Sequence, residues 1–302
     1  MRKKILAACS ALVIGGGLLF SPMRAEAIDT WGIAAQALGV LGAYHSALGA
    51  VLALGNDVHA QHESERQDIE ENGRARNARD IALVDRVMQR LVRDGDYVLR
   101  VNSLPFVWAV NDSPIFNAAC YPTDYVSINR GLIRGLNGSE DELAAVLGHE
   151  MTHGYNQHTA NAAAKYAIAD FAGDLASNAL SSATFGVGSE LTDDWIKFLQ
   201  VKNINVPNEK DADRNGFYTM ASAGFNPGGP AAAMARMSYY TEHRDQFTDF
   251  FEPADHPDTR NRLKDMAALL TAYGIGHPEV RNVNDVYFDK ELLLIAEPDG
   301  AQ

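Results

Sequence analysis

The sequence predicts an α+β fold that is mainly helical and carries one small β-sheet. Three observations lead to this prediction. The run from Glu142 to Leu147 is apolar and helix-forming, a second helical pattern covers residues 162–179, and the segment 98–133 holds short apolar runs separated by turn residues. With 46% apolar and 22% charged residues, the 302-residue chain has an ordinary globular composition.

Residues 1–27 have the features of a secretory signal peptide. Three basic residues at positions 2–4 precede an apolar stretch from Ile5 to Phe20, and Ala25-Glu26-Ala27 resembles a cleavage site. Cleavage would leave 302 − 27 = 275 residues with Cys120 as the single cysteine, which excludes an intrachain disulfide. We therefore expect an exported protein, periplasmic where the cell has a periplasm and otherwise secreted or on the cell surface.

The net charge argues against two classes of partner. The full chain carries 26 − 39 = −13, and the mature chain would carry 22 − 38 = −16. Such a charge disfavours binding to nucleic acid and to anionic membrane surfaces. The sequence does not indicate the oligomeric state.

Residues 28–80 are predicted to form an N-terminal helical segment. Within it, residues 30–56 carry no charge and are long enough to span a bilayer. Small residues recur there at spacings of three and four, which is typical of close helix packing, and His45 and Gln36 weaken a spanning segment. A helix packed on the protein is favoured, with a membrane anchor as the alternative. A further helix is predicted from Ile81 to Val92.

The segment 98–133 is predicted to form the β structure. Its strand-like runs are Phe106–Val110, Asn117–Cys120 and Tyr125–Ile128. The second run has small side chains and closes on Pro122, which suits an edge strand. The alternative is an interior strand whose Cys120 thiol is buried.

The sequence His-Glu-Met-Thr-His, which begins at His149, carries the chemistry. Residues four apart share one face of a helix, so His149 and His153 can reach one metal ion while Glu150 lies beside it. Ser139 is a predicted N-cap, and Glu142 completes a capping box, so the motif lies on a helix. This pattern is half of a catalytic zinc site with a general base. The alternative is a pair of histidines on an ordinary surface helix.

A third ligand has two candidates in the sequence. His158 lies five residues after His153, one residue short of the metzincin spacing, and is interpreted as a helix-end residue. Glu209 opens a new helix, and Asp213 lies four residues later on the same face. One carboxylate can bind zinc while the other orients an imidazole. The alternative is an acidic helix N-terminus stabilised by the helix dipole.

Two further segments complete a family pattern. Gly-Phe-Asn-Pro follows the Glu209 helix at residues 224–227, and His256-Pro257 precedes Arg262 by six residues. Together with HExxH, these segments resemble the zinc metallopeptidases that include the prenyl-CAAX endopeptidases, the HtpX-like membrane proteases and the periplasmic BepA-type proteases. The resemblance covers residues 81–270, the predicted metallopeptidase domain. Residues 271–302 are then a C-terminal extension.

The resemblance implies a gluzincin, zincin-like fold with one zinc ion per chain. It implies that His149, His153 and Glu209 are the zinc ligands and that Glu150 is the general base. Asp213 would then orient a ligand from outside the coordination sphere.

The resemblance also places His256 and Arg262 at the cleft, where they would stabilise the oxyanion or plug the site. Three departures from the family pattern bear on this. We expect no membrane helices like those of the integral members and no tetratricopeptide-like region after the domain, and Arg260 competes with Arg262 for its role.

The expected function is that of an exported zinc endopeptidase acting on unfolded or envelope proteins. An exposed strand edge can bind a peptide in extended form, which makes Asn117, Ala118 and Ala119 the predicted substrate-binding residues. The alternative is a zinc-stabilised binding or chaperone-like envelope protein whose site is plugged by His256.

Overall fold

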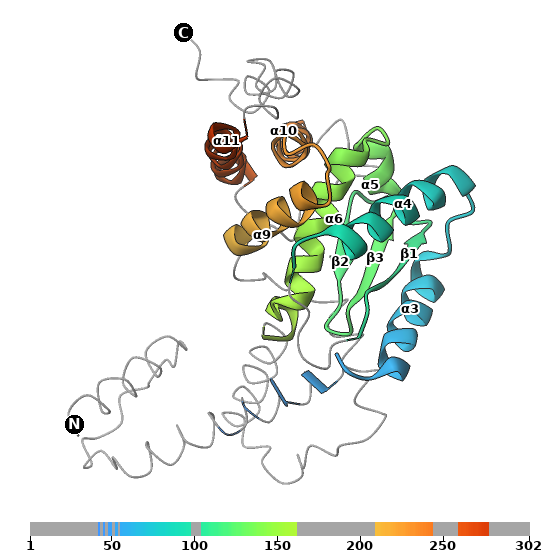
Figure 1. The fold of residues 1–302 in the computed structure, drawn as a ribbon. Helices are drawn as coiled ribbons and strands as arrows, with labels where there is room; N and C mark the ends of the chain where they lie inside the picture. Colours follow the sequence, from blue (N-terminus) through green and yellow to red (C-terminus); the bar gives the residue numbers. More distant parts are fainter. Residues whose placement is uncertain are drawn as a thin grey trace, which may run out of the picture. The chain divides into compact units, whose positions relative to one another are not determined.

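The structure is a computed structural model that describes residues 55–97, 104–161, 209–243 and 259–277, with a few single positions between 42 and 53. It confirms the mainly helical α+β fold, in which helices pack around one small sheet (Figure 1). The helices are α3 Val58–Asn72, α4 Ala78–Asp94, α5 Arg130–Gly135, α6 Glu140–Tyr155, α9 Glu209–Ser222, α10 Gly229–Glu242 and α11 Thr259–Gly276. The strands are β1 Val107–Asn111, β2 Ala118–Cys120 and β3 Tyr125–Asn129.

Several expectations concern residues outside these ranges. They are the signal peptide, most of residues 30–56, the helix over 162–179, His256 and most of residues 271–302. The described residues from Leu52 onward belong to one compact unit. Among the residues that the structure describes, no helix combines the length and the apolar character needed to cross a membrane.

The sheet has the strand order β1-β3-β2, so β2 is an edge strand, as the sequence predicts. β1 runs parallel to β3, and β2 runs antiparallel to it. Each of the three predicted strands lies within one residue of its observed bounds. Cys120 is at the same time on the edge strand and buried, with 4% of its surface exposed.

The predicted end of the β segment at Ile133 is wrong, because residues 130–135 form helix α5. Leu132, Ile133 and Leu136 are all buried, and Leu132 and Leu136 lie one helical turn apart. An apolar run this short has no period that separates a buried strand from a buried helix.

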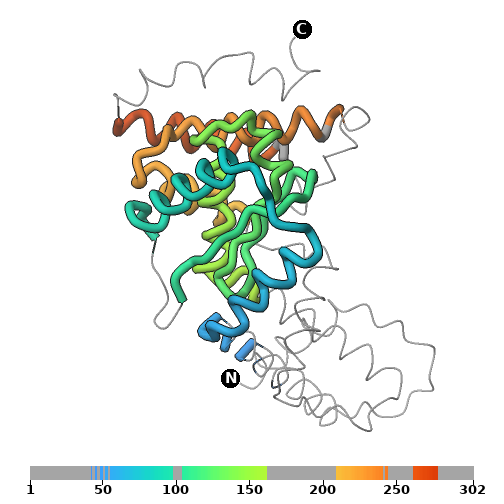
Figure 2. Tube along the Cα trace, turned by 90° about the vertical axis from the view of Figure 1, so that its right-hand side faces the viewer, coloured from blue at the N-terminus to red at the C-terminus, as the bar shows by residue number. Residues whose placement is uncertain are grey.

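Helix α6 lies between the sheet and the C-terminal helices (Figures 1 and 2). It contacts β2, and it also contacts α4, α9 and α10; α11 packs on α10 and α9. Helix α3 packs against strands β1 and β3 of the sheet. Leu147 and Met151 of α6 are fully buried in the shared core, so the helix that carries HExxH is held on several sides.

The N-terminus of α6 is capped by Ser139, as predicted, with Ser139 Oγ accepting from the Glu142 N–H at 3.4 Å. The predicted return bond of the capping box is wrong. The Ser139 N–H donates to Leu136 O, and the Glu142 carboxylate instead accepts from Arg236 Nε of α10 at 2.5 Å. The Glu142 side chain is buried, so tertiary pairing with a cation outweighs a local backbone bond.

Two glycines allow α6 and α9 to touch through their backbones. A Cβ atom on Gly216 would lie 2.7 Å from His149 N, and one on Gly148 would lie 2.9 Å from Gly216 O. Real Cβ atoms do not approach backbone this closely, and a rigid helix backbone cannot yield as a flexible side chain would. The crossing therefore requires glycine on both helices, and it sets the distance between HExxH and the start of α9.

We expect Gly216→Ala to lower the free energy of unfolding by about 1–3 kcal/mol, the usual cost of overpacking a close contact. Gly274→Ala in α11 is the matched control, because its Cβ atom meets nothing within 4 Å. That control should be neutral or stabilise the protein by about 0.5–1 kcal/mol through helix propensity. Urea unfolding measures both; equal stabilities would show that the crossing tolerates a side chain.

Candidate active site

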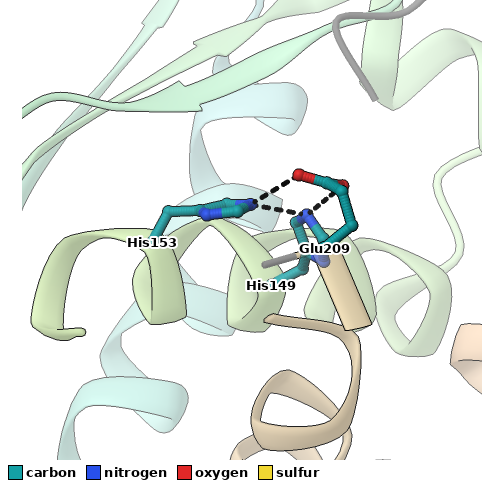
Figure 3. A group of neighbouring side chains, drawn as sticks. All are labelled: His149, His153 and Glu209. Carbon is teal, nitrogen blue, oxygen red and sulfur yellow. Dashed lines mark hydrogen bonds and ion pairs between the residues drawn. The ribbon is translucent and has the colours of Figure 1, made fainter. Parts of the chain in front are cut away.

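Three potential metal donors converge from two helices. His149 and His153 lie one turn apart on α6, and Glu209 is the first residue of α9 (Figure 3). The two Nε2 atoms are 2.9 Å apart, and the Glu209 carboxylate lies 3.5 Å from His149 Nε2 and 3.4 Å from His153 Nε2. One donor atom from each residue lies within 4.8 Å of the others.

This donor set fits a zinc ion. Ligand atoms about 2.1 Å from a tetrahedral ion lie roughly 3.4 Å from each other, which matches both imidazole-to-carboxylate distances. Both imidazoles are buried, with 6% and 2% of their surface exposed. Nitrogen and carboxylate ligands are those that catalytic zinc sites use, with one position left open. The structure thus brings together His149, His153 and Glu209, although Glu209 is 56 residues beyond the second histidine.

Asp213 orients His149. The Asp213 Oδ1 atom lies 2.8 Å from His149 Nδ1, and a carboxylate can only accept, so Nδ1 carries the proton and Nε2 faces the other donors. Burial alone would lower the pKa of His149, but the hydrogen bonds with Asp213 and Glu209 outweigh it and raise the pKa to about 9. Burial alone would raise the pKa of Asp213, but hydrogen bonds from Arg262 and His149 lower it to about 2.

Arg262 lies in the site and faces the carboxylates of α9. Its Nε and Nη2 atoms donate to the two oxygens of Asp213 at 2.8 and 2.6 Å, and Nη1 lies 3.1 Å from Glu209 Oε2. With 3% of its side chain exposed, this is a buried ion pair that fixes both carboxylates. Burial alone would lower the pKa of Arg262, but Asp213 and Glu209 raise it. The side chain of the competing Arg260 is outside the described residues.

His158 and Asp211 orient His153, a feature that the sequence interpretation missed. The Asp211 Oδ2 atom lies 3.2 Å from His158 Nε2, and His158 Nδ1 lies 3.1 Å from His153 Nδ1. Burial lowers the pKa of His158, which keeps the ring neutral with one proton. Since Nε2 donates to Asp211, Nδ1 of His158 must accept from His153 Nδ1, and His153 Nε2 is left to face the other donors.

The interpretation of His158 as only a helix-end residue is therefore incomplete, since it lies just past α6 and contacts His153. A signal was present in the alternation of Glu209, Asp211 and Asp213. The first acid faces the imidazoles of His149 and His153 directly, Asp213 contacts His149, and Asp211 contacts His158, which in turn contacts His153. The short spacing of these acids on one helix start allows a single segment to serve both histidines.

Glu150 lies between the motif helix and the sheet edge. The Cys120 N–H of β2 donates to Glu150 Oε2 at 3.3 Å, and Glu150 shares the lining of one cavity with His149. This places a carboxylate beside the histidine pair and directly against the predicted substrate-binding strand.

Only one of the predicted substrate-binding residues directs its backbone outward. Asn117 O and Tyr121 N bond to β3, and Ala119 is paired with Ser127. Because hydrogen-bonding direction alternates along a strand, Ala118 points its N–H and C=O away from β3. Cys120 also points outward, but its N–H and C=O are used by Glu150 and Thr159. On the outer edge of β2, Ala118 is therefore the remaining residue whose backbone groups do not bond to β3, and it is buried with 5% of its surface exposed.

A buried pair of histidines, a distant glutamate and a neighbouring carboxylate define a metallopeptidase of the HExxH class. The family model for peptidase family M48 matches residues 79–270. The chain belongs to peptidase family M48. It is also similar to a Vibrio cholerae serotype O1 protein assigned as a beta-barrel assembly-enhancing protease, with 28% identity over 201 residues. That match covers 63% of this chain and spans 39% of the length of the relative.

We expect Asp211→Ala to weaken zinc binding about 10- to 100-fold, the usual effect of removing a group that orients a ligand. The side chain is 47% exposed, so the fold should persist. Asp94→Ala is the matched control, because it removes a partly exposed carboxylate that pairs with Arg93. Competition with a fluorescent zinc chelator measures the affinity. An unchanged dissociation constant for Asp211→Ala would exclude the orienting role.

Proposed function

We propose that the protein is an exported zinc-dependent endopeptidase. The observation that carries the proposal is the convergence of His149, His153 and Glu209 beside Glu150 at the edge of the sheet. When bound, zinc would polarise the substrate carbonyl and lower the pKa of a water molecule to about 7. All other contributions come from residues of the chain.

Glu150 is the general base and then the general acid. Its carboxylate takes a proton from the attacking water and passes it to the nitrogen of the leaving amine, so one group serves both halves of the reaction. The Cys120 N–H holds this carboxylate on the side of the site that faces the sheet. Proton transfer of this kind requires the base to lie within hydrogen-bond reach of the water. The hydrogen bond from β2 restricts the rotamers of the Glu150 side chain.

The substrate would bind in extended form along β2, with main-chain hydrogen bonds to Ala118. Arg262 acts as a positioning residue, because its guanidinium is engaged by Asp213 and Glu209. The role of oxyanion donor then falls to His256, which remains a prediction from the family resemblance.

The proposal also covers the location of the protein and the class of its substrates. The signal-like residues 1–27 support export, and the strongly acidic mature chain supports a protein substrate over a nucleic acid. The name of the Vibrio cholerae relative points to the assembly of β-barrel proteins, and we extend that setting to this chain as a hypothesis. Unassembled envelope proteins are then the proposed substrates.

We expect Glu150→Gln to keep zinc but to lower kcat for a protein substrate at least about 100-fold, since the amide cannot accept the proton. Unfolded casein, with its fragments separated by electrophoresis and sequenced, provides the measurement. Zinc content by elemental analysis should be one ion per chain in both proteins.

Two controls bracket this result. His149→Ala should lose both zinc and cleavage, and the wild type treated with a chelator should lose cleavage until zinc is restored. Normal cleavage by Glu150→Gln would rule out the proposed base, and cleavage by zinc-free wild type would rule out the metal.

A further inference from the structure

Cys120 of β2 contacts the segment from Glu150 to Thr159 at three points. Its N–H donates to Glu150 Oε2 at 3.3 Å, and its carbonyl oxygen accepts from Thr159 Oγ1 at 3.2 Å. Its sulfur lies close to Gly154, where an added Cβ atom would be 2.7 Å from Sγ. The residue that donates to the proposed base is therefore itself bound by the end of the helix that carries the base and by the residues just after it.

Pairing with β3 does not fix the outer side of β2 at this residue. Asn117 O and Tyr121 N bond to β3, so the alternation along the strand points the N–H and C=O of Cys120 away from it. The strand has only three residues, so its ladder with β3 supplies few bonds. The bond from Thr159 therefore restrains a side of the strand end that the sheet does not reach.

Helix α3 fixes the turn that follows Cys120. Gln61 Nε2 donates to Thr123 O at 3.0 Å, and the hydroxyl oxygens of Ser64 and Thr123 lie 3.0 Å apart. Gln61, Ser64 and Thr123 are all buried, so water does not compete for these bonds. Because α3 restrains the turn independently, removal of the Thr159 hydroxyl should release Cys120 locally and leave the sheet folded.

We propose that Thr159 is a positioning residue for Glu150 and that it acts through Cys120. The proposal rests on the proposed peptidase function, because it concerns the general base of that reaction. The Thr159 hydroxyl restrains the end of β2, and this restraint keeps the Cys120 N–H where it can donate to the Glu150 carboxylate. A general base must lie within hydrogen-bond reach of its proton, so a small displacement of the carboxylate slows the reaction.

Thr159→Val keeps the shape of the side chain and removes the hydroxyl. We expect kcat of the zinc-loaded variant for unfolded casein to fall about three- to tenfold, the rate equivalent of one hydrogen bond, with KM and zinc content unchanged. Thr159→Ser retains the donor and should keep the wild-type kcat. Thr271→Val is the matched control, because its hydroxyl also donates to a backbone carbonyl, that of Ala267 within α11.

A second measurement follows the Cys120 N–H directly and does not depend on cleavage. The chain has two cysteines, so labelling with ¹⁵N-cysteine gives two backbone amide signals, and Cys9→Ser identifies the signal of Cys120. We expect Thr159→Val to raise the hydrogen-exchange rate of this amide about three- to tenfold, because its bond to Glu150 opens more often. Thr159→Ser and Thr271→Val should exchange at the wild-type rate.

The two measurements distinguish failure of the positioning role from failure of the peptidase function. An unchanged exchange rate of Cys120 in Thr159→Val would overturn the positioning role, whether or not the wild type cleaves casein. Faster exchange with an unchanged kcat, or an equal loss of kcat in Thr159→Ser, would also overturn it, because the bond would then be structural only. Faster exchange with no cleavage by the zinc-loaded wild type would support the link from Thr159 to Glu150 and reject the peptidase function.

Discussion

The contact between the backbones of Gly148 and Gly216 is the constraint on which the site depends. Gly148 directly precedes His149, and Gly216 lies about two turns into α9 from Glu209. Because the helices meet without intervening side chains, the first turn of α9 reaches the histidine pair of α6. A Cβ atom at either glycine would force the two helices apart and displace Glu209 from those imidazoles.

Charge balance explains the groups around the donors. Asp213 is a buried carboxylate and the Glu209 side chain is 11% exposed, and Arg262 compensates them with contacts to both. A buried charge without a partner costs several kcal/mol, so removal of the arginine would leave the start of α9 under strong repulsion. Hydrogen bonds with Asp213 and Glu209 raise the pKa of His149, and the same negative charge would favour a divalent cation held between the donors.

The sequence predicts the parts of this arrangement that depend on local periodicity. The HExxH helix with Ser139 as its cap, the strands and the edge position of β2 follow from spacing, capping and turn residues. The pairing of Glu142 with Arg236 does not, because 94 residues separate them and only the packing of α6 on α10 decides it. The contacts that join Asp211 through His158 to His153 were not predicted for the same reason, since the packing of distant segments decides them. Helix α5 was not predicted because its apolar run is too short to show a helical period.

The most direct test of the account is X-ray absorption spectroscopy at the zinc edge on wild type and Glu209→Ala, each loaded with one equivalent of zinc. We expect the wild type to show a first shell of two imidazole nitrogens and two oxygens at about 2.0–2.2 Å, one of them from Glu209. Glu209→Ala should bind zinc far more weakly or replace that oxygen by solvent. Identical spectra and identical zinc affinity for the two proteins would contradict the account.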